Sequence, residues 1–333
     1  QASAAKDLLT DLVNNSGVID AHGISTDGGV VRLIGSGGGT VDSGSIDASG
    51  VHGGSVQLLS DQNVDVDGSV DASGARGGGS IRVGGGARGG EGLTQAENTT
   101  VGANAVLNVD ATQSGNGGSI AVWSNQTSSI AGSFSARGGA QGGNGGAVET
   151  SGEHVHIADG TLVSTLAPAG QSGNWLIDPT DFTISSSGSG TISGTPGVPT
   201  SDVSATTLQN ALANGDVSIE SSNGASGTSG DINIDQALSW SANTLTLTAA
   251  HSININADVS VSGTGGLGLH PTSSVGDSGA LAGGTVIIGS GDTLTLGGSG
   301  TLYLPSNGIE NNGSLVFDLG TDYTYAYEVS GTG

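Results

Sequence analysis

Short runs of alternating apolar and polar residues recur along the first half of the chain at a nearly constant interval. Each run follows a Gly-Gly pair, and Val, Ile or Leu recurs in alternation within it. The pairs begin at residues 28, 53, 78, 117 and 145, so the intervals are 25, 25, 39 and 28 residues. A period of two is typical of a strand with one buried face. Two further short runs occupy each interval, which predicts three strands per repeat, and the 39-residue interval indicates an insertion near residues 87–98.

Three short strands in about 25 residues do not bury a core by themselves, whereas stacked copies do. Each copy then pairs its strands with the copies before and after it, ~4.8 Å away. The pattern therefore predicts an all-β chain folded as a parallel β-helix of about 25 residues per coil, with glycine at the corners. Residues 205–213 read Ala-Thr-Thr-Leu-Gln-Asn-Ala-Leu-Ala and precede Asn-Gly, which predicts one short helix.

The repeat pattern divides the chain into three parts. Residues 1–170 hold the Gly-rich β-helix repeats. Residues 171–204 are interpreted as a junction, because they contain the segment Asn-Trp-Leu-Ile-Asp-Pro and then a stretch rich in Ser, Gly and Pro. Residues 205–333 return to strict alternation, with Thr and Asn on the outer face, and are interpreted as a second β-helix segment.

Composition and charge exclude several classes of protein. The 333 residues include 64 Gly and no Cys, and the net charge is −24. All six basic residues precede residue 138, and residues 138–333 contain seventeen carboxylates and no Lys or Arg. Binding to nucleic acid and to anionic membranes depends on basic side chains. We therefore expect neither partner. No apolar run is long enough to span a bilayer, so we expect no membrane insertion. We also expect a monomer.

Several segments resemble the filamentous-haemagglutinin-like exoproteins, which are large bacterial adhesins. The segments that resemble them read Asn-Trp-Leu-Ile-Asp-Pro at 174–179, Asp-Phe-Thr-Ile at 181–184, Leu-Ser-Trp-Ser-Ala-Asn-Thr-Leu-Thr-Leu at 238–247 and Ile-Glu-Asn-Asn-Gly-Ser-Leu-Val-Phe at 309–317. The resemblance implies a right-handed β-helix exported by two-partner secretion, through an outer-membrane secretion partner. It also implies a secreted or cell-surface protein of a Gram-negative bacterium. No segment resembles the amino-terminal secretion domain, so we expect an interior fragment.

Four aspartates occupy positions that the repeat makes equivalent: Asp20, Asp47, Asp71 and Asp110. The flanking apolar residues point inward, so these carboxylates are expected to point outward and to stack along the solenoid. Calcium between them is one interpretation, because hard cations bind carboxylate oxygens. The other, which we favour, is that each carboxylate accepts a backbone N–H at a corner or is solvated.

Aromatic residues are the candidate sugar contacts, since they are scarce in this chain. Alternation places Trp123 outward, where its ring is a candidate for stacking on a saccharide, and places Trp240 inward. Three tyrosines share one strand face, and we favour an inward position for them over a sugar-binding platform: Tyr323, Tyr325 and Tyr327.

His154 and His156 share a strand face as well, and we expect them to be solvated, with a zinc site as the alternative. The scarcity of basic residues and the absence of a nucleophile elbow or a phosphate-binding Gly-Lys-Ser/Thr motif predict a binding protein rather than an enzyme. The expected function is that of a rigid rod whose polar faces bind a polysaccharide, a cell-surface glycan or a receptor, as in adhesins and biofilm-matrix proteins. A carbohydrate-active β-helix enzyme and a ligand-free spacer are the alternatives.

Overall fold

A computed structural model describes most of the chain. The described residues are 12–21, 28–188, 201–222, 230–251, 253–255, 257, 259–271, 286–288, 293–298, 302–303, 309–319 and 328–333. They divide into two compact units, one of residues 1–155, 160–176 and 190–192, the other of residues 156–159, 177–189 and 193–333. The strand pairs in both units are parallel, so the predicted parallel β-helix is confirmed.

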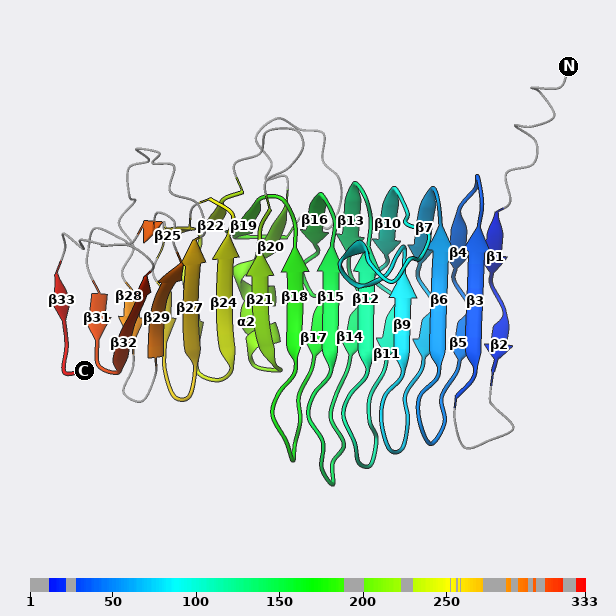
Figure 1. Cartoon of the computed structure of the whole chain (residues 1–333), viewed down its shortest axis with the longest axis horizontal. Helices are drawn as coiled ribbons and strands as arrows, with labels where there is room; N and C mark the ends of the chain where they lie inside the picture. The colour runs from blue at the N-terminus through cyan, green and yellow to red at the C-terminus, as the bar shows by residue number, and fades with distance from the viewer. Residues whose placement is uncertain are drawn as a thin grey trace, which may run out of the picture. The chain divides into compact units, whose positions relative to one another are not determined.

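Each coil of the first unit places one short strand in each of three sheets (Figure 1). The first sheet contains β1 (Val13–Asn15), β4 (Thr40–Asp42), β7 (Asn63–Val66), β10 (Asn98–Val101), β13 (Thr127–Ile130) and β16 (His154–Ile157). The second contains β2 (Val18–Asp20), β5 (Ser45–Asp47), β8 (Ser69–Asp71), β11 (Val106–Asn108), β14 (Ser133–Ser135) and β17 (Leu162–Ser164). The third contains β3 (Val30–Gly35), β6 (Ser55–Ser60), β9 (Ser80–Val83), β12 (Ser119–Trp123), β15 (Ala147–Ser151) and β18 (Asn174–Asp178). The coils wind in the right-handed sense.

The second unit repeats this arrangement with its own strands. One sheet contains β20 (Asp202–Ser204), β19 (Phe182–Ser185), β22 (Ile232–Ile234), β25 (Ile253–Ile255) and β30 (Leu302–Tyr303). Another contains β21 (Asp216–Glu220), β24 (Thr244–Ala249), β27 (Gly266–Pro271), β29 (Thr293–Gly298) and β32 (Ser314–Leu319). The third contains β23 (Leu238–Trp240), β26 (Val259–Val261), β28 (Val286–Ile288), β31 (Ile309–Asn311) and β33 (Val329–Ser330).

The register of the third sheet matches the intervals predicted from the Gly-Gly pairs. Val30 pairs with Ser55, Ser55 with Ser80, Ser80 with Ser119, and Ser119 with Ala147. The longer step between Ser80 and Ser119 contains the predicted insertion, which leaves the third sheet after β9 and includes the short 3-10 helix η1 (Ala87–Gly89). Within the first unit, the sequence pattern therefore located both the coils and the large insertion among them.

Apolar side chains of successive coils stack inside the solenoid. In the second sheet the inward position is occupied by residues that are at most 6% exposed: Ile46, Val70, Leu107, Phe134 and Val163. Burial of one such side chain stabilises the fold by roughly 1.5–3 kcal/mol. Because every coil contributes one side chain to each column, this stabilisation is distributed evenly along the unit.

The one helix longer than a single turn in the described residues is α2 (Ala205–Leu212), which confirms the helix predicted at 205–213. Ser204 precedes it in an extended conformation, and its Oγ accepts a hydrogen bond from the backbone N–H of Thr207 at 3.2 Å. Leu208 and Leu212 are buried on its inner face. The helix therefore packs against the strands of the second unit.

Candidate functional site

The most prominent surface feature of the first unit is a set of five stacked loops, which we call the loop wall. Each loop joins a strand of the second sheet to the next strand of the third sheet. The loops comprise residues 48–54, 72–79, 109–118, 136–146 and 165–173, and they extend below the strands in Figure 1. Since all five leave the solenoid at the same corner, they form a continuous surface.

Backbone hydrogen bonds join each loop to the next. Gly74 N–H donates to Asp110 O at 2.9 Å, Ala111 N–H donates to Arg137 O at 2.8 Å, and Gly138 N–H donates to Leu166 O at 2.8 Å. Side chains add to this network, since Asn144 N–H donates to Asn116 Oδ1 at 2.8 Å. The loop wall is therefore held in one conformation by the ladder that also joins the strands.

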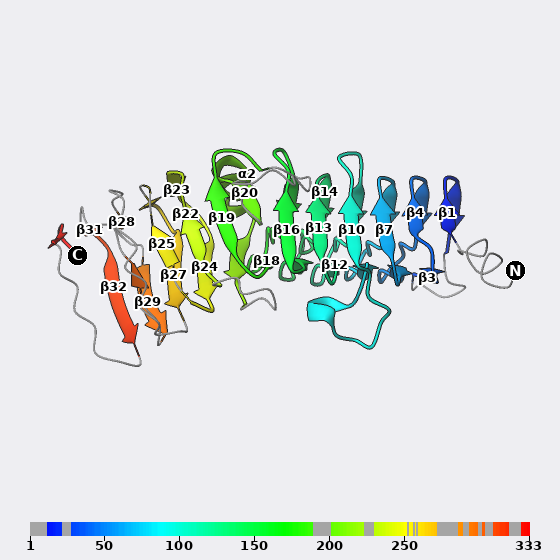
Figure 2. The same ribbon diagram turned by 90° about the horizontal axis from the view of Figure 1, so that it is seen from above.

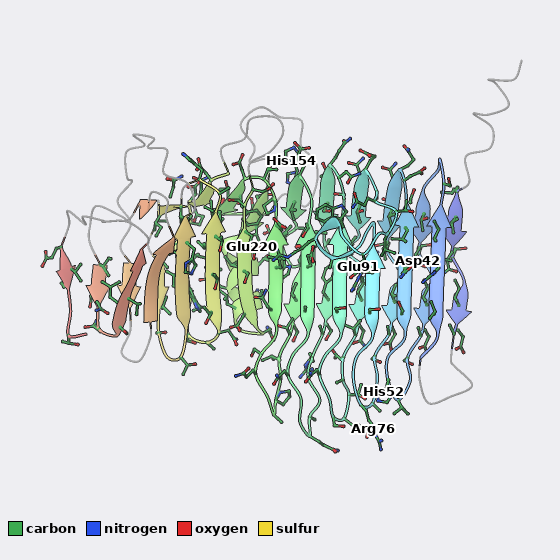
Figure 3. The ribbon with its side chains drawn as sticks, in the orientation of Figure 1. Asp42, His52, Arg76, Glu91, His154 and Glu220 are labelled. Carbon is green, nitrogen blue, oxygen red and sulfur yellow. The ribbon has the colours of Figure 1, made fainter. Side chains whose placement is uncertain are left out.

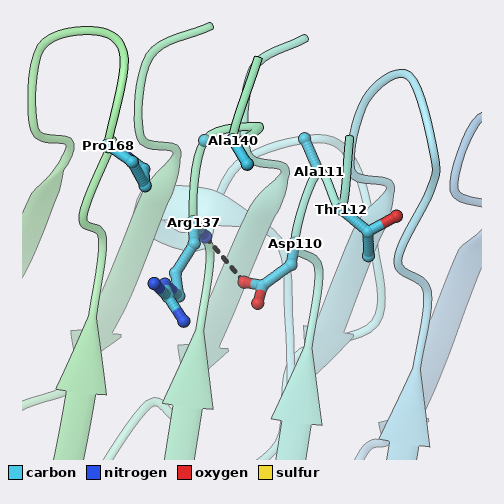
Figure 4. Close-up of a pocket in the computed structure, with 7 residues that line it drawn as sticks. Asp110, Ala111, Thr112, Arg137, Ala140 and Pro168 are labelled. Atoms are coloured by element: carbon cyan, nitrogen blue, oxygen red, sulfur yellow. Dashed lines mark hydrogen bonds between the residues drawn. The ribbon is translucent and has the colours of Figure 1, made fainter. Parts of the chain in front are cut away.

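A hollow of about 320 Å³ opens in the loop wall across three successive coils (Figure 4). This volume is at the lower end of the range typical of small-ligand sites. The residues that line it are Asp110, Ala111, Thr112, Arg137, Gly138, Ala140 and Pro168. Asp110, Arg137 and Pro168 supply an acidic, a basic and an apolar group to this lining.

Asp110 is fixed by two hydrogen bonds to one of its oxygens. Ser135 Oγ donates to Asp110 Oδ1 at 2.6 Å, and the backbone N–H of Arg137 donates to the same oxygen at 2.7 Å. Among the described residues, no hydrogen bond reaches Asp110 Oδ2 or the guanidinium of Arg137. The hollow thus combines one oriented acceptor and one cationic donor.

The guanidinium of Arg82, unlike that of Arg137, has a side-chain partner within the described part of the chain. The guanidinium of Arg82 is held by Glu91, with Nε–Oε2 and Nη2–Oε1 distances of 2.9 Å. Arg137 is exposed, as is Arg76, and the latter lies with His52 at the ends of neighbouring loops (Figure 3). The loop wall therefore presents basic groups on a chain with a net charge of −24.

The aspartate column contains three of the four predicted members. Asp20 pairs with Asp47, and Asp47 pairs with Asp71. The residue next in register is Asn108, so the predicted equivalence of Asp110 is wrong. Asp110 lies two residues further along, in the loop wall. The repeated Val-Asp-Ala triplet suggested the equivalence, but the inward position of Leu107 determines the register.

Carboxylates in this column accept backbone N–H groups. Ser49 N–H donates to Asp47 Oδ1 at 2.9 Å, and Ser73 N–H donates to Asp71 Oδ1 at 2.8 Å. This is the arrangement that the favoured interpretation of these residues describes. Within the described ranges, no group of three or more His, Asp or Glu side chains is placed to hold a metal ion.

Trp123 faces outward as expected, but the insertion covers it. We call residues 84–95 the flap; it contains η1 and projects from the third sheet in Figure 2. A Cβ added to Gly89 would lie 2.7 Å from Cζ2 of Trp123, so flap backbone and indole ring are in close contact. The indole Nε1 is buried without a hydrogen-bond partner. Trp123 is therefore packed beneath the flap and does not present an open ring to a sugar, contrary to the expectation.

The remaining aromatic and histidine predictions have mixed outcomes. Trp240 is 7% exposed, which confirms its inward position. The residues Tyr323, Tyr325 and Tyr327 lie outside the described residues. His156 is buried, and its Nδ1 lies 3.0 Å from Oδ1 of buried Asp202, so the prediction of a solvated side chain is wrong. The two residues are 46 positions apart, and no sequence pattern indicated the pair.

No protein-family model matches the chain, and no curated protein matches it. Among the helices of the described residues, none has the length and apolar character required to cross a membrane. The strand pairing identifies the fold class as a parallel β-helix. The function is inferred from the surface of this fold.

Proposed function

We propose that this chain is a carbohydrate-binding segment of an exported bacterial adhesin or biofilm-matrix protein. In this proposal the β-helix is a rigid support, and the loop wall is the surface that contacts a polysaccharide or a cell-surface glycan. Export by two-partner secretion, and a place outside a Gram-negative cell, are proposed from the sequence resemblance alone.

The observation that carries the proposal is the loop wall itself. Five consecutive loops project from one corner, and their backbones are joined by hydrogen bonds. Binding residues occur most often on loops that a rigid scaffold positions. A preorganised surface loses little conformational entropy when it binds a ligand. Repetition of loops at one corner also suits a repetitive polymer, because several weak contacts combine.

Catalysis is not part of this proposal. Hydrolysis of a glycosidic bond generally requires two carboxyl groups on opposite sides of the bond. The hollow is lined by one carboxylate, Asp110. We therefore propose that the loop wall binds saccharide without cleaving it.

Co-sedimentation with insoluble and biofilm polysaccharides tests the proposal. The purified chain is mixed with each polysaccharide, and the supernatant is assayed for protein and for released sugar. Depletion of protein without release of sugar is the expected result. Release of oligosaccharides would overturn the non-catalytic assignment, and no depletion with any polysaccharide would favour a ligand-free spacer.

A further inference from the structure

We propose that the hollow lined by Asp110 and Arg137 is a subsite for a neutral saccharide, recognised through a pair of neighbouring hydroxyl groups. This inference rests on the carbohydrate-binding function proposed above. It adds the position of a site and the chemical class of its ligand.

The shape of the hollow favours an extended ligand. Its lining residues come from three successive loops, with Asp110 and Thr112 in the first, Arg137 and Ala140 in the second, and Pro168 in the third. Successive coils are ~4.8 Å apart, so the hollow extends along the solenoid axis over roughly 10 Å. The exposed Ala140 is among the lining residues, and its short side chain occupies little of the space.

The polar groups match the hydrogen bonding of a diol. A sugar hydroxyl both donates and accepts, so two adjacent hydroxyls are satisfied by one acceptor beside one donor. Asp110 is held through Oδ1 by Ser135 and by the Arg137 backbone. Its Oδ2 and the Arg137 guanidinium have no hydrogen-bond partner among the described residues, so both remain available to a ligand. Hydrogen bonds to such charged groups are stronger than those between neutral groups.

The apolar groups lie where a sugar ring would contact the hollow. Pro168 and Ala140 are both exposed at its edge. Their side chains offer C–H surface to the C–H face of a pyranose, whereas the charged pair binds its hydroxyls. Small-ligand sites commonly combine an apolar surface with a few oriented polar groups in this way.

Charge favours a neutral sugar over a uronate. Asp110 and Arg137 together contribute no net charge to the hollow, and the whole chain carries −24. A uronate would place a second carboxylate near Asp110, and like charges at short distance repel. A polymer of uronates would also be repelled by the long-range field of the protein.

Binding to a glycan array tests the subsite. The array carries neutral manno-, gluco- and galacto-hexasaccharides beside oligouronates of the same linkage. Three variants are compared with the intact chain: Asp110→Asn, Arg137→Gln and Ala140→Gln. Asn at position 110 still offers an oxygen to Ser135 and Arg137, and Gln at position 140 fills the hollow without changing its charge. Circular dichroism and thermal unfolding establish that each variant is folded.

Arg32→Gln is the matched control, because Arg32 is exposed on β3 and its loss changes the net charge by the same amount as Arg137→Gln. We expect the intact chain to bind at least one neutral hexasaccharide more tightly than the corresponding oligouronate. Asp110→Asn and Arg137→Gln are each expected to weaken that binding about tenfold, the effect of losing one charge-assisted hydrogen bond. Ala140→Gln is expected to weaken it because the longer side chain occupies the hollow. Arg32→Gln is expected to bind as the intact chain does.

Other outcomes overturn different parts of the argument. Equal binding by the intact chain and all three variants would show that the hollow is not the subsite, while the carbohydrate-binding function would stand. Preference for oligouronates that is lost in Arg137→Gln would overturn the assignment of a neutral ligand. No binding to any glycan, together with no depletion in co-sedimentation, would overturn the proposed function itself.

Discussion

The Gly-Gly pairs that precede the third-sheet strands lie where neighbouring coils approach most closely. A Cβ on Gly79 would lie 2.1 Å from the carbonyl oxygen of Gly54 and 2.8 Å from that of Ala72. Backbone atoms cannot yield to such contacts without a shift of the coil. Glycine is therefore required here by the distance between coils rather than by a positive φ.

Gly79→Ala is expected to lower the free energy of unfolding by about 3 kcal/mol, the upper part of the range for overpacking. Gly17→Ala is the control, since no atom lies within 4 Å of a Cβ at that position. Urea unfolding followed by circular dichroism measures both variants. Equal stability of the two would contradict the steric argument.

Asp42 illustrates a buried carboxyl group with incomplete hydrogen bonding. Asn15 Nδ2 donates to its Oδ1 at 2.8 Å, whereas its Oδ2 is buried without a partner. Burial raises the pKa of Asp42 above the ordinary 3.8, against the opposing hydrogen bonds from Asn15 and Gly44. A raised pKa in the folded state means that Asp42 stabilises the fold below the unfolded pKa and loses this contribution as the pH rises through the folded pKa.

Asp42→Asn removes this titration. The free energy of unfolding of the variant minus that of the intact chain is expected to become more positive as the pH rises from below the ordinary 3.8 through the raised pKa of Asp42, by roughly 1.4 kcal/mol for each unit of pKa shift. Urea unfolding at several pH values measures the difference. A difference that does not change with pH would contradict the assignment.

Predictions from sequence succeeded at the residue scale where a side chain determines its own direction. Trp123 was placed outward and Trp240 inward from alternation alone. Predictions from sequence failed where a distant segment determines what surrounds a side chain, as with the flap over Trp123 or Asp202 beside His156. The prediction for Asp110 failed for another reason, because its Val-Asp-Ala triplet lies in the loop after β11, and that loop (residues 109–118) is longer than the loop after β8 (residues 72–79).

The flap is the element that interrupts the regular coil. Arg82 on β9 binds Glu91 at one end of it, and the buried Glu149 accepts a hydrogen bond from the Arg88 backbone N–H at 2.6 Å. The Arg82 hydrogen bond lowers the pKa of the Glu91 carboxyl below the ordinary 4.5. The ion pair is therefore intact at a pH above this lowered pKa, and its contribution to stability is lost as the pH falls through the lowered pKa.

Glu91→Gln is expected to loosen the flap. Exposed ion pairs contribute about 0.5 kcal/mol, so the open fraction is expected to rise about two- to threefold. Tryptic cleavage after Arg88, followed by mass spectrometry, measures flap opening. Asp65→Asn, an exposed carboxylate on β7, is the charge-matched control and is expected to leave the cleavage rate unchanged.

At the scale of elements, the sequence predicted the coils, the insertion and α2, because each depends on a local pattern. The position of the flap across the third sheet was not predictable, since it depends on Glu149, 61 residues from Arg88. The loop wall was also missed. Its loops differ in sequence and length, and their common corner becomes evident only when the strands are stacked.

At the scale of the whole molecule, carboxylates dominate the electrostatics. The chain has thirty acidic and six basic residues. Repulsion among the excess carboxylates destabilises a compact state. Salt reduces the repulsion, since the Debye length falls from about 10 Å at 0.1 M to about 3 Å at 1 M. Added NaCl is therefore expected to raise the melting temperature by several degrees.

A comparison of CaCl₂ with MgCl₂ at equal ionic strength separates this general screening from specific binding. Since no group of three or more acidic or histidine side chains within the described ranges is placed to hold a metal, both salts are expected to raise the melting temperature equally. A larger increase with calcium that disappears in Asp47→Asn would assign the ion to the column of Asp20, Asp47 and Asp71.

The regular register also has a kinetic consequence. Residues that pair between coils are separated by one repeat, as in the 25 residues from Val30 to Ser55 and from Ser55 to Ser80. The entropy of closing a loop depends on that separation and not on the total length of the chain. Folding in such an array nucleates at one coil and propagates to its neighbours. Additional coils therefore add further folding steps of the same length, and none of those steps becomes slower.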